Sequence, residues 1–158
     1  MTERQAPRLS LILGEQTSRL EIRQQDGVSE TYSLAFGLDA MTPGPFRRDP
    51  PSALELEQAI MVVEDVLMPL AARIPPHETL WLHGPYPLAD QLGGEHLSRE
   101  SVEQLFGQFA AMVEGDPLAA ANLPKARHFA ATLLILREWM HHLDARQVIL
   151  ADQSVPGP

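Results

Sequence analysis

The sequence contains no cysteine among its 158 residues. This absence excludes disulfide bonds, thiolate metal ligands and cysteine nucleophiles. Any chemistry that the chain performs must therefore use oxygen groups or the imidazoles of its 6 histidines. We expect no cofactor, because no pattern for binding one stands out.

Long hydrophobic runs are also missing. The longest nearly continuous apolar stretch, 129–136, is far too short to span a bilayer core of about 30 Å. The opening residues, MTERQAPRLS, have neither the apolar run nor the cleavage site of a signal peptide. These features predict a cytoplasmic protein that does not contact membranes.

Positive charge is scarce. The chain has 12 Lys and Arg residues against 21 Asp and Glu residues, and its formal net charge is -9. Non-specific affinity for nucleic acids comes largely from clustered Lys and Arg. We therefore expect no nucleic-acid partner.

The alternation of apolar residues near the start of the chain indicates three strands. Apolar side chains recur at every second position in three short runs. Turn-forming residues separate the first run from the second and the second run from the third. This pattern predicts an antiparallel meander with one buried face, which is formed by Leu9, Leu11, Leu13, Leu20, Ile22, Tyr32, Leu34 and Phe36. The length predicts a single domain over residues 8–152, with disordered ends at 1–7 and 153–158.

Helical spacing replaces this alternation in the rest of the chain. Ser52 and Glu55 form a capping box ahead of an apolar stripe that runs to Leu70, and Pro69 should kink this helix or end it early. A buried strand is predicted at 79–83, an irregular segment at 84–97, and a helix from about 98. A central helix should follow from about 124, and the last strand should lie at 147–151.

The predicted order of elements is β-β-β-α-β-α-α-β. It indicates an α/β (or α+β) fold in which helices pack on one mixed five-stranded sheet. This order is similar to that of ribonuclease H-like domains, whose nucleases are expected to carry an Asp in the first strand. Here the corresponding strand reads LSLIL, so a metal site of the standard nuclease type is absent or displaced.

The strong catalytic motifs are missing: there is no phosphate loop, dinucleotide fingerprint, nucleophile elbow or HExxH helix. In the predicted sheet, Glu15, His83 and Asp152 follow three strands whose carboxyl ends share one edge. Two acids and an imidazole could hold a divalent ion or transfer a proton. The alternative is that all three are ordinary surface and turn residues.

A second group of candidates lies on the last helix. Glu138, His141 and His142 stand at spacings of three and four, which place a carboxylate and imidazoles on neighbouring positions of one helical face. Such a group could bind a metal ion. The alternative is a solvated helix end, at which the histidines favour the negative end of the helix dipole.

The basic pair Arg47-Arg48 precedes the capped start of the first helix, where free backbone N–H groups attract anions. A phosphate or carboxylate could dock there. The alternative is that the two arginines pair with the nearby acids Asp49, Glu55 and Glu57.

The irregular segment between the fourth strand and the second helix is longer than most connections. It carries the polar side chains Tyr86, Asp90 and His96, and a Gly-Gly pair gives it backbone freedom. It could close over a ligand as a lid, or it could be a surface excursion without a role.

These observations favour a non-catalytic interaction or assembly module over an enzyme. Broad apolar helix stripes indicate a partner, either a second copy of the chain in a homodimer or another protein. The alternative is a small metal-dependent hydrolase, or an enzyme that binds an anion or another ligand, using the strand-end acids and histidine.

Overall fold

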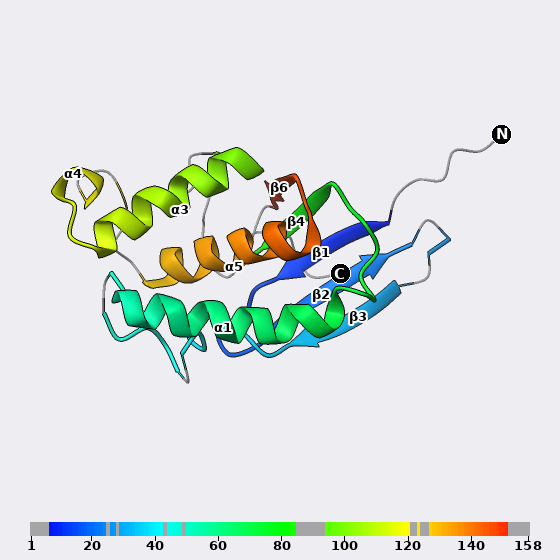
Figure 1. The fold of residues 1–158 in the computed structure, drawn as a ribbon. Helices are drawn as coiled ribbons and strands as arrows, with labels where there is room; N and C mark the ends of the chain where they lie inside the picture. The colour runs from blue at the N-terminus through cyan, green and yellow to red at the C-terminus, as the bar shows by residue number, and fades with distance from the viewer. Residues whose placement is uncertain are drawn as a thin grey trace.

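The fold is built on a six-stranded sheet, which the computed structural model shows with its strands in the order β3-β2-β1-β4-β6-β5 (Figure 1). The structure describes residues 7–24, 26–27, 29–42, 44–48, 50–84, 94–120, 123 and 127–151. The strands are β1 (Arg8–Ile12), β2 (Ser18–Arg23), β3 (Ser29–Leu34), β4 (Thr79–His83), β5 (His96–Ser98) and β6 (Gln147–Leu150). The helices are α1 (Ala53–Leu70), α3 (Arg99–Val113), α4 (Pro117–Ala120) and α5 (Arg127–Leu143).

The first three strands form the predicted antiparallel meander. Leu9 pairs with Ile22 across β1 and β2, and Leu20 pairs with Tyr32 across β2 and β3. Strand β4 then runs parallel to β1, and β6 runs parallel to β4, which makes the sheet mixed as the sequence indicated. Leu9 and Ile22 are fully buried, and because strand side chains alternate, a shift of one residue would expose this whole apolar set.

Helix α5 occupies the centre of the helical layer, between α1 and α3 (Figure 1). Every side chain from Phe129 to Leu136 is buried, and Trp139 has no exposed surface. A helix that is apolar on all sides must be covered on all sides, so the prediction of a central helix is confirmed. It ends at Leu143, after which Asp144 takes a left-handed conformation with φ of 59°.

Two local features differ from the sequence-based expectation. Residues 96–98, expected at the end of an irregular segment and the start of a helix, form the short strand β5, which pairs with β6 and makes six strands where five were predicted. Three residues are too few for an alternating pattern to be recognised. Pro69 does not end α1 early, because it lies in the last turn, where the helix ends at Leu70 in any case.

None of the helices in the described ranges has both the length and the apolar character that a bilayer span requires.

The two faces of the sheet differ in character. Leu9, Leu11, Leu80 and Leu82 point into the core beneath the helices. The residues that alternate with them on β1 and β4 point to the opposite face; Arg8 is exposed and the others are half buried. On that face the Arg8 guanidinium lies 3.9 Å from the centre of the Trp81 ring.

A buried imidazole joins the sheet to α5. The indole N–H of Trp139 donates to Nε2 of His77 at 3.0 Å, and Nδ1 of His77 lies 2.9 Å from the carbonyl oxygen of Pro75. Because the indole can only donate, Nε2 accepts and Nδ1 carries the proton, so this geometry requires a neutral ring. Burial lowers the pKa of His77, and the Pro75 carbonyl opposes this shift only in part.

We predict that protonation of His77 weakens the fold. With its folded pKa below the ordinary value of 6.5, the stabilisation is present above pH 6.5 and is lost as pH falls toward the folded pKa. In urea unfolding between pH 7.5 and 5.5, His77→Gln should lose less stability than the wild type. The glutamine amide offers both a donor and an acceptor, and it does not take up a proton in this pH range. The exposed His141→Gln should keep the wild-type slope, and equal slopes for all three proteins would contradict this account.

Candidate functional site

The turn between β1 and β2 is held at the carboxyl edge of the sheet by backbone hydrogen bonds. Leu13 N donates to His83 O at 2.8 Å, which ties the start of the turn to the end of β4. Leu38 N donates to Gly14 O at 2.9 Å, and Asp39 N donates to Glu15 O at 2.8 Å. The segment that follows β3 is therefore fastened along the turn.

Two glycines permit this close approach. A Cβ on Gly14 would lie 2.2 Å from Thr17 O, and a Cβ on Gly37 would lie 2.5 Å from Glu15 O. Both distances are shorter than any side chain tolerates, and the atoms in the way belong to the backbone. The conformation of the turn thus depends on glycine at both positions.

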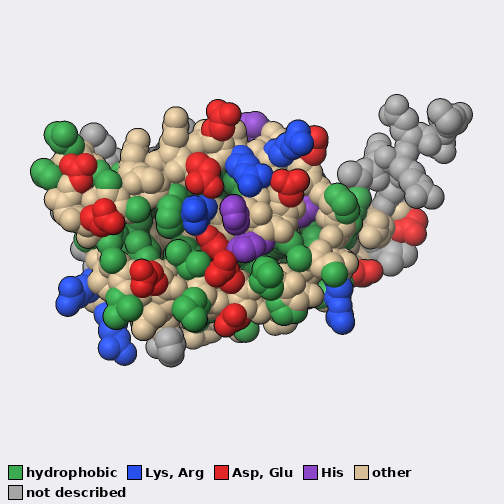
Figure 2. Space-filling model, viewed as in Figure 1, with side chains coloured by type: hydrophobic (Ala, Val, Ile, Leu, Met, Phe, Trp, Pro, Cys, Tyr) green, Lys and Arg blue, Asp and Glu red, His purple; other side chains and the backbone are tan. Residues whose placement is uncertain are grey.

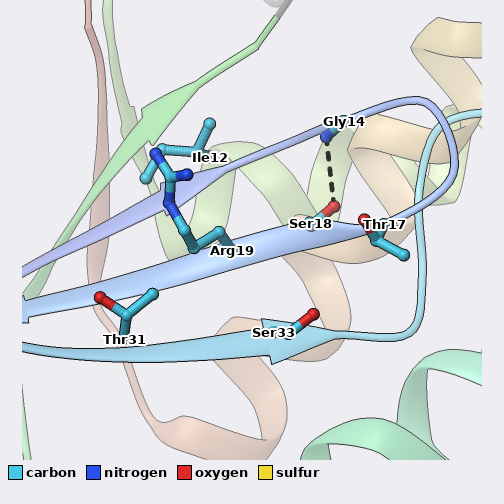
Figure 3. A pocket seen from close by; sticks show the side chains of 7 residues that line it. All are labelled: Ile12, Gly14, Thr17, Ser18, Arg19, Thr31 and Ser33. Atoms are coloured by element: carbon cyan, nitrogen blue, oxygen red, sulfur yellow. Dashed lines mark hydrogen bonds between the residues drawn. The ribbon is translucent and has the colours of Figure 1, made fainter.

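The buried hydroxyl of Ser18 closes the turn from inside. Its Oγ accepts a hydrogen bond from Gly14 N at 3.3 Å (Figure 3). The same Oγ donates a hydrogen bond to Phe36 O at 2.8 Å. One side chain thus links the turn, β2 and the segment after β3, and we define residues 14–18 together with 36–39 as the turn clamp.

A shallow pocket of about 320 Å³ lies beside the turn clamp, on the face of the sheet away from the core (Figure 3). Arg19 extends from β2 toward Ile12 of β1, while hydroxyl side chains come from the turn and from β3. The lining residues are Ile12, Gly14, Thr17, Ser18, Arg19, Thr31 and Ser33. The Arg19 side chain is 55% exposed, and its Nε lies 3.2 Å from Glu21 Oε2. Its remaining N–H groups can reach a ligand.

His83 stands next to this pocket in the same row of the sheet. Ile12 pairs with Arg19 on one side and with His83 on the other, so the two polar side chains flank one apolar residue. Burial lowers the pKa of His83, and the nearby Arg8 lowers it further, whereas Glu21 raises it. At neutral pH the ring is therefore uncharged and able to accept a proton.

The structure brings two of the three predicted strand-end residues to one edge. His83 ends β4, and Glu15 lies exposed in the β1–β2 turn. Asp152 lies outside the described residues. Arg19, Thr31 and Ser33 were not among the predicted site residues. The alternation of polar with apolar residues places all three on the outer face of β2 and β3.

Arg47 and Arg48 are exposed ahead of α1. The Glu55 carboxylate there accepts from Arg47 N at 2.7 Å and from Ser52 N at 3.1 Å, so the predicted capping box is present. Burial alone would raise the pKa of Glu55, but these hydrogen bonds outweigh it, and with Arg48 nearby the pKa is lowered. The N–H groups of Arg47 and Ser52 already donate to Glu55, so they are not free to bind an anion. Anion binding by the two arginine side chains stays a prediction.

The expected lid falls largely outside the described residues, which include neither Tyr86 nor Asp90. His96 lies in β5, where its Nε2 is 2.6 Å from Gln147 Oε1. This contact belongs to the pairing of β5 with β6.

The candidates on α5 divide into buried and exposed groups. Glu138 is only 2% exposed, so it does not belong to a solvated helix end. His142 is half buried beside it, whereas His141 is exposed. Glu64 of α1, which the sequence analysis did not select, completes the group, because its Oε2 lies 3.0 Å from His142 Nε2.

No family model and no curated protein sequence matches the chain. The mixed six-stranded sheet with its helices is similar in fold to a domain of solved Ppx/GppA structures.

Three solved structures carry this match. The Ppx/GppA enzyme of Aquifex aeolicus superposes with a TM-score of 0.68 at 15% identity over 94% of this chain and 54% of its own. An exopolyphosphatase-like protein gives 0.67 at 14% identity over 94% and 55%, and an exopolyphosphatase from Cytophaga hutchinsonii gives 0.63 at 14% identity over 92% and 53%. The chain thus spans about half the length of each neighbour.

These neighbours contradict the main functional prediction. The sequence favours a non-catalytic interaction module over an enzyme, whereas the fold is shared with proteins named as phosphatases and exopolyphosphatases. The prediction was wrong because it relied on missing motifs, and a site can be formed by residues that no short motif joins. The hydrolase alternative agrees better with the comparisons.

The expectation of a protein partner stays a prediction. Along α1, Leu54, Met61 and Met68 are each more than half exposed. They recur at steps of seven and so form one stripe on the helix. Apolar side chains are visible over α1 in Figure 2.

We predict that Gly37→Ala destabilises the protein by about 1–3 kcal/mol, because the new Cβ would push the backbone of the turn clamp apart. Gly107→Ala is the matched control. Gly107 lies within α3 with open space around it, so alanine should stabilise the helix by about 0.5–1 kcal/mol. Urea unfolding midpoints measure both effects, and two changes of the same sign would show that Gly37 is not sterically required.

Proposed function

We propose that this chain is the phosphate-binding half of a phosphohydrolase-type enzyme that acts on a linear phosphate chain. The pocket beside the turn clamp binds phosphoryl oxygens, with Arg19 as the cationic donor and the hydroxyls of Thr17, Thr31 and Ser33 as neutral donors. The observation that carries this proposal is the position of the pocket, at the carboxyl edge of a sheet shared with exopolyphosphatases.

The chemistry of the pocket supports an oxyanion ligand. A guanidinium presents N–H groups in a planar fork that suits phosphate, and its bonds to charged oxygens are stronger than neutral hydrogen bonds. The hydroxyls can rotate to donate. The turn clamp holds Thr17 and Ser18 in place before a ligand arrives, which lowers the entropy cost of binding.

The pocket does not have the ligands of a divalent metal site. Mg²⁺ in phosphoryl transfer is held by carboxylates, yet none of the described residues that line the pocket is acidic. Of the nearby carboxylates, Glu21 is paired with Arg19 and Glu15 of the turn does not line the pocket. Strand β1 contributes the apolar Ile12 to the lining. The proposal therefore relies on direct recognition of oxygens by this chain's own donors.

His83 provides a proton acceptor on β4, with strand β1 between it and Arg19 of β2. In hydrolysis of a phosphate chain, water attacks the terminal phosphorus and the P–O–P bond breaks. The shortened chain leaves with the bridging oxygen, and the attacked phosphoryl group becomes orthophosphate. A neutral imidazole can accept the proton of the attacking water. The lowered pKa of His83 keeps the ring in that state at neutral pH.

Binding and turnover are separate parts of this proposal. The chain spans about half of each neighbour, so groups from elsewhere can be needed for turnover. Recognition of phosphate oxygens needs only the described pocket.

We predict that Arg19→Ala weakens the binding of tripolyphosphate about ten- to hundredfold, which corresponds to the loss of hydrogen bonds to a charged group. Isothermal titration calorimetry measures the affinity. Arg23→Ala is the matched control: it removes the same charge from the same strand, but Arg23 does not line the pocket. If both variants bind tripolyphosphate equally weakly, the effect comes from the loss of net positive charge, and the proposed specific site is refuted.

For turnover, we predict that His83→Gln abolishes phosphate release from tripolyphosphate while binding stays within about twofold. Wild-type release should stay level from pH 8 down to about 6.5 and fall only below it, because burial holds the pKa of His83 under the ordinary histidine value. Phosphate release in a colorimetric assay tests this. If the variant releases phosphate as fast as the wild type, His83 is not the proton acceptor. The proposed binding site would be unaffected by that result.

A further inference from the structure

A cluster of two carboxylates and one imidazole joins α1 to α5, on the helical layer and away from the pocket. His142 Nε2 lies 3.0 Å from Glu64 Oε2 and 3.3 Å from Glu138 Oε1. All three atoms lie within 4.8 Å of one another. Figure 2 shows histidine, acidic and basic side chains gathered in the middle of this face, between α5 and α1.

A proton on His142 does not satisfy this arrangement well. Nε2 carries at most one hydrogen, and two carboxylate oxygens compete for it. The Glu138 side chain is only 3% exposed, so water cannot readily replace the missing donor. Leaving a buried charged acceptor short of a partner is costly.

A metal ion would satisfy all three atoms at once. Zinc binds imidazole nitrogen and carboxylate oxygen at about 2.0–2.2 Å in tetrahedral geometry, so neighbouring ligand atoms stand roughly 3.3 Å apart. The observed separations of 3.0 and 3.3 Å are close to this spacing. Glu64 and His142 are partly exposed, so water can reach a fourth position.

The surroundings fix the ligands and their charge. Arg137 Nη1 holds Glu138 Oε2 at 2.9 Å and leaves Oε1 for the cluster. Arg137 Nε lies 3.6 Å from Glu103 Oε2 on α3. Three carboxylates and one guanidinium give a formal local charge of about minus two, which one divalent ion balances. Contacts of this kind orient metal ligands.

We propose that Glu64, Glu138 and His142 form a binding site for a transition-metal divalent cation of the zinc type. The imidazole ligand favours Zn²⁺ over Mg²⁺ or Ca²⁺, which prefer oxygen ligands. The ion cross-links α1 to the central helix α5. This site is separate from the oxyanion pocket and does not depend on the proposed function.

The test is titration of the full chain with ZnCl₂ by calorimetry after removal of metals with a chelator. We expect about one ion per chain, a rise in the thermal midpoint with zinc by mass action, and visible absorption typical of tetrahedral Co²⁺ when cobalt is used. Glu64→Gln keeps the shape of a partly exposed side chain and removes one ligand, so it should weaken binding at least tenfold. His142→Ala should do the same.

His141→Ala is the matched control, because it removes the neighbouring exposed imidazole and should leave binding unchanged. Circular dichroism establishes that each variant is folded without metal. The proposal is overturned if the wild type binds no zinc at micromolar concentration, if Glu64→Gln and His142→Ala bind as tightly as the wild type, or if His141→Ala loses binding equally. In the first case the cluster is an ion pair only.

Discussion

The site depends on one steric constraint, the contact between the backbone of the β1–β2 turn and the backbone of the segment after β3. Gly14 and Gly37 allow these chains to meet, and the hydrogen bonds from Leu38 and Asp39 hold them together. This turn determines where the side chains of Thr17 and Arg19 lie in the pocket. A residue with a side chain at Gly37 would separate the two segments, so local sterics and the position of the candidate donors are linked.

Electrostatics then separates two regions of the protein with different chemistry. At the carboxyl edge of the sheet, Arg19 and the hydroxyls offer donors, which suits an anion. Between α1 and α5, Glu64 and Glu138 offer acceptors around an imidazole, which suits a cation. A net charge of -9 describes neither region, because each depends on which side chains the fold brings together.

Much of the architecture could be predicted from periodicity. The structure contains the elements that three local patterns predict. These patterns are the alternating leucines of β1 and β2, the capping box at Ser52 and the apolar surface of α5. Strand β5 could not be predicted, because three residues carry no period. The candidate site was predicted only in part: His83 follows from its place at a strand end, whereas Arg19 and Glu64 acquire meaning only through neighbours that are distant in sequence.

The position of β6 in the sheet has a consequence for how the chain reaches this fold. Residues 147–150 lie between β4 and β5, although they follow both in the sequence. While the protein is being synthesised, the edge of β4 that pairs with β6 stays unpaired until β6 has left the ribosome. An open edge of this kind can pair with other chains, so the nascent protein should be most prone to aggregation just before its sheet closes.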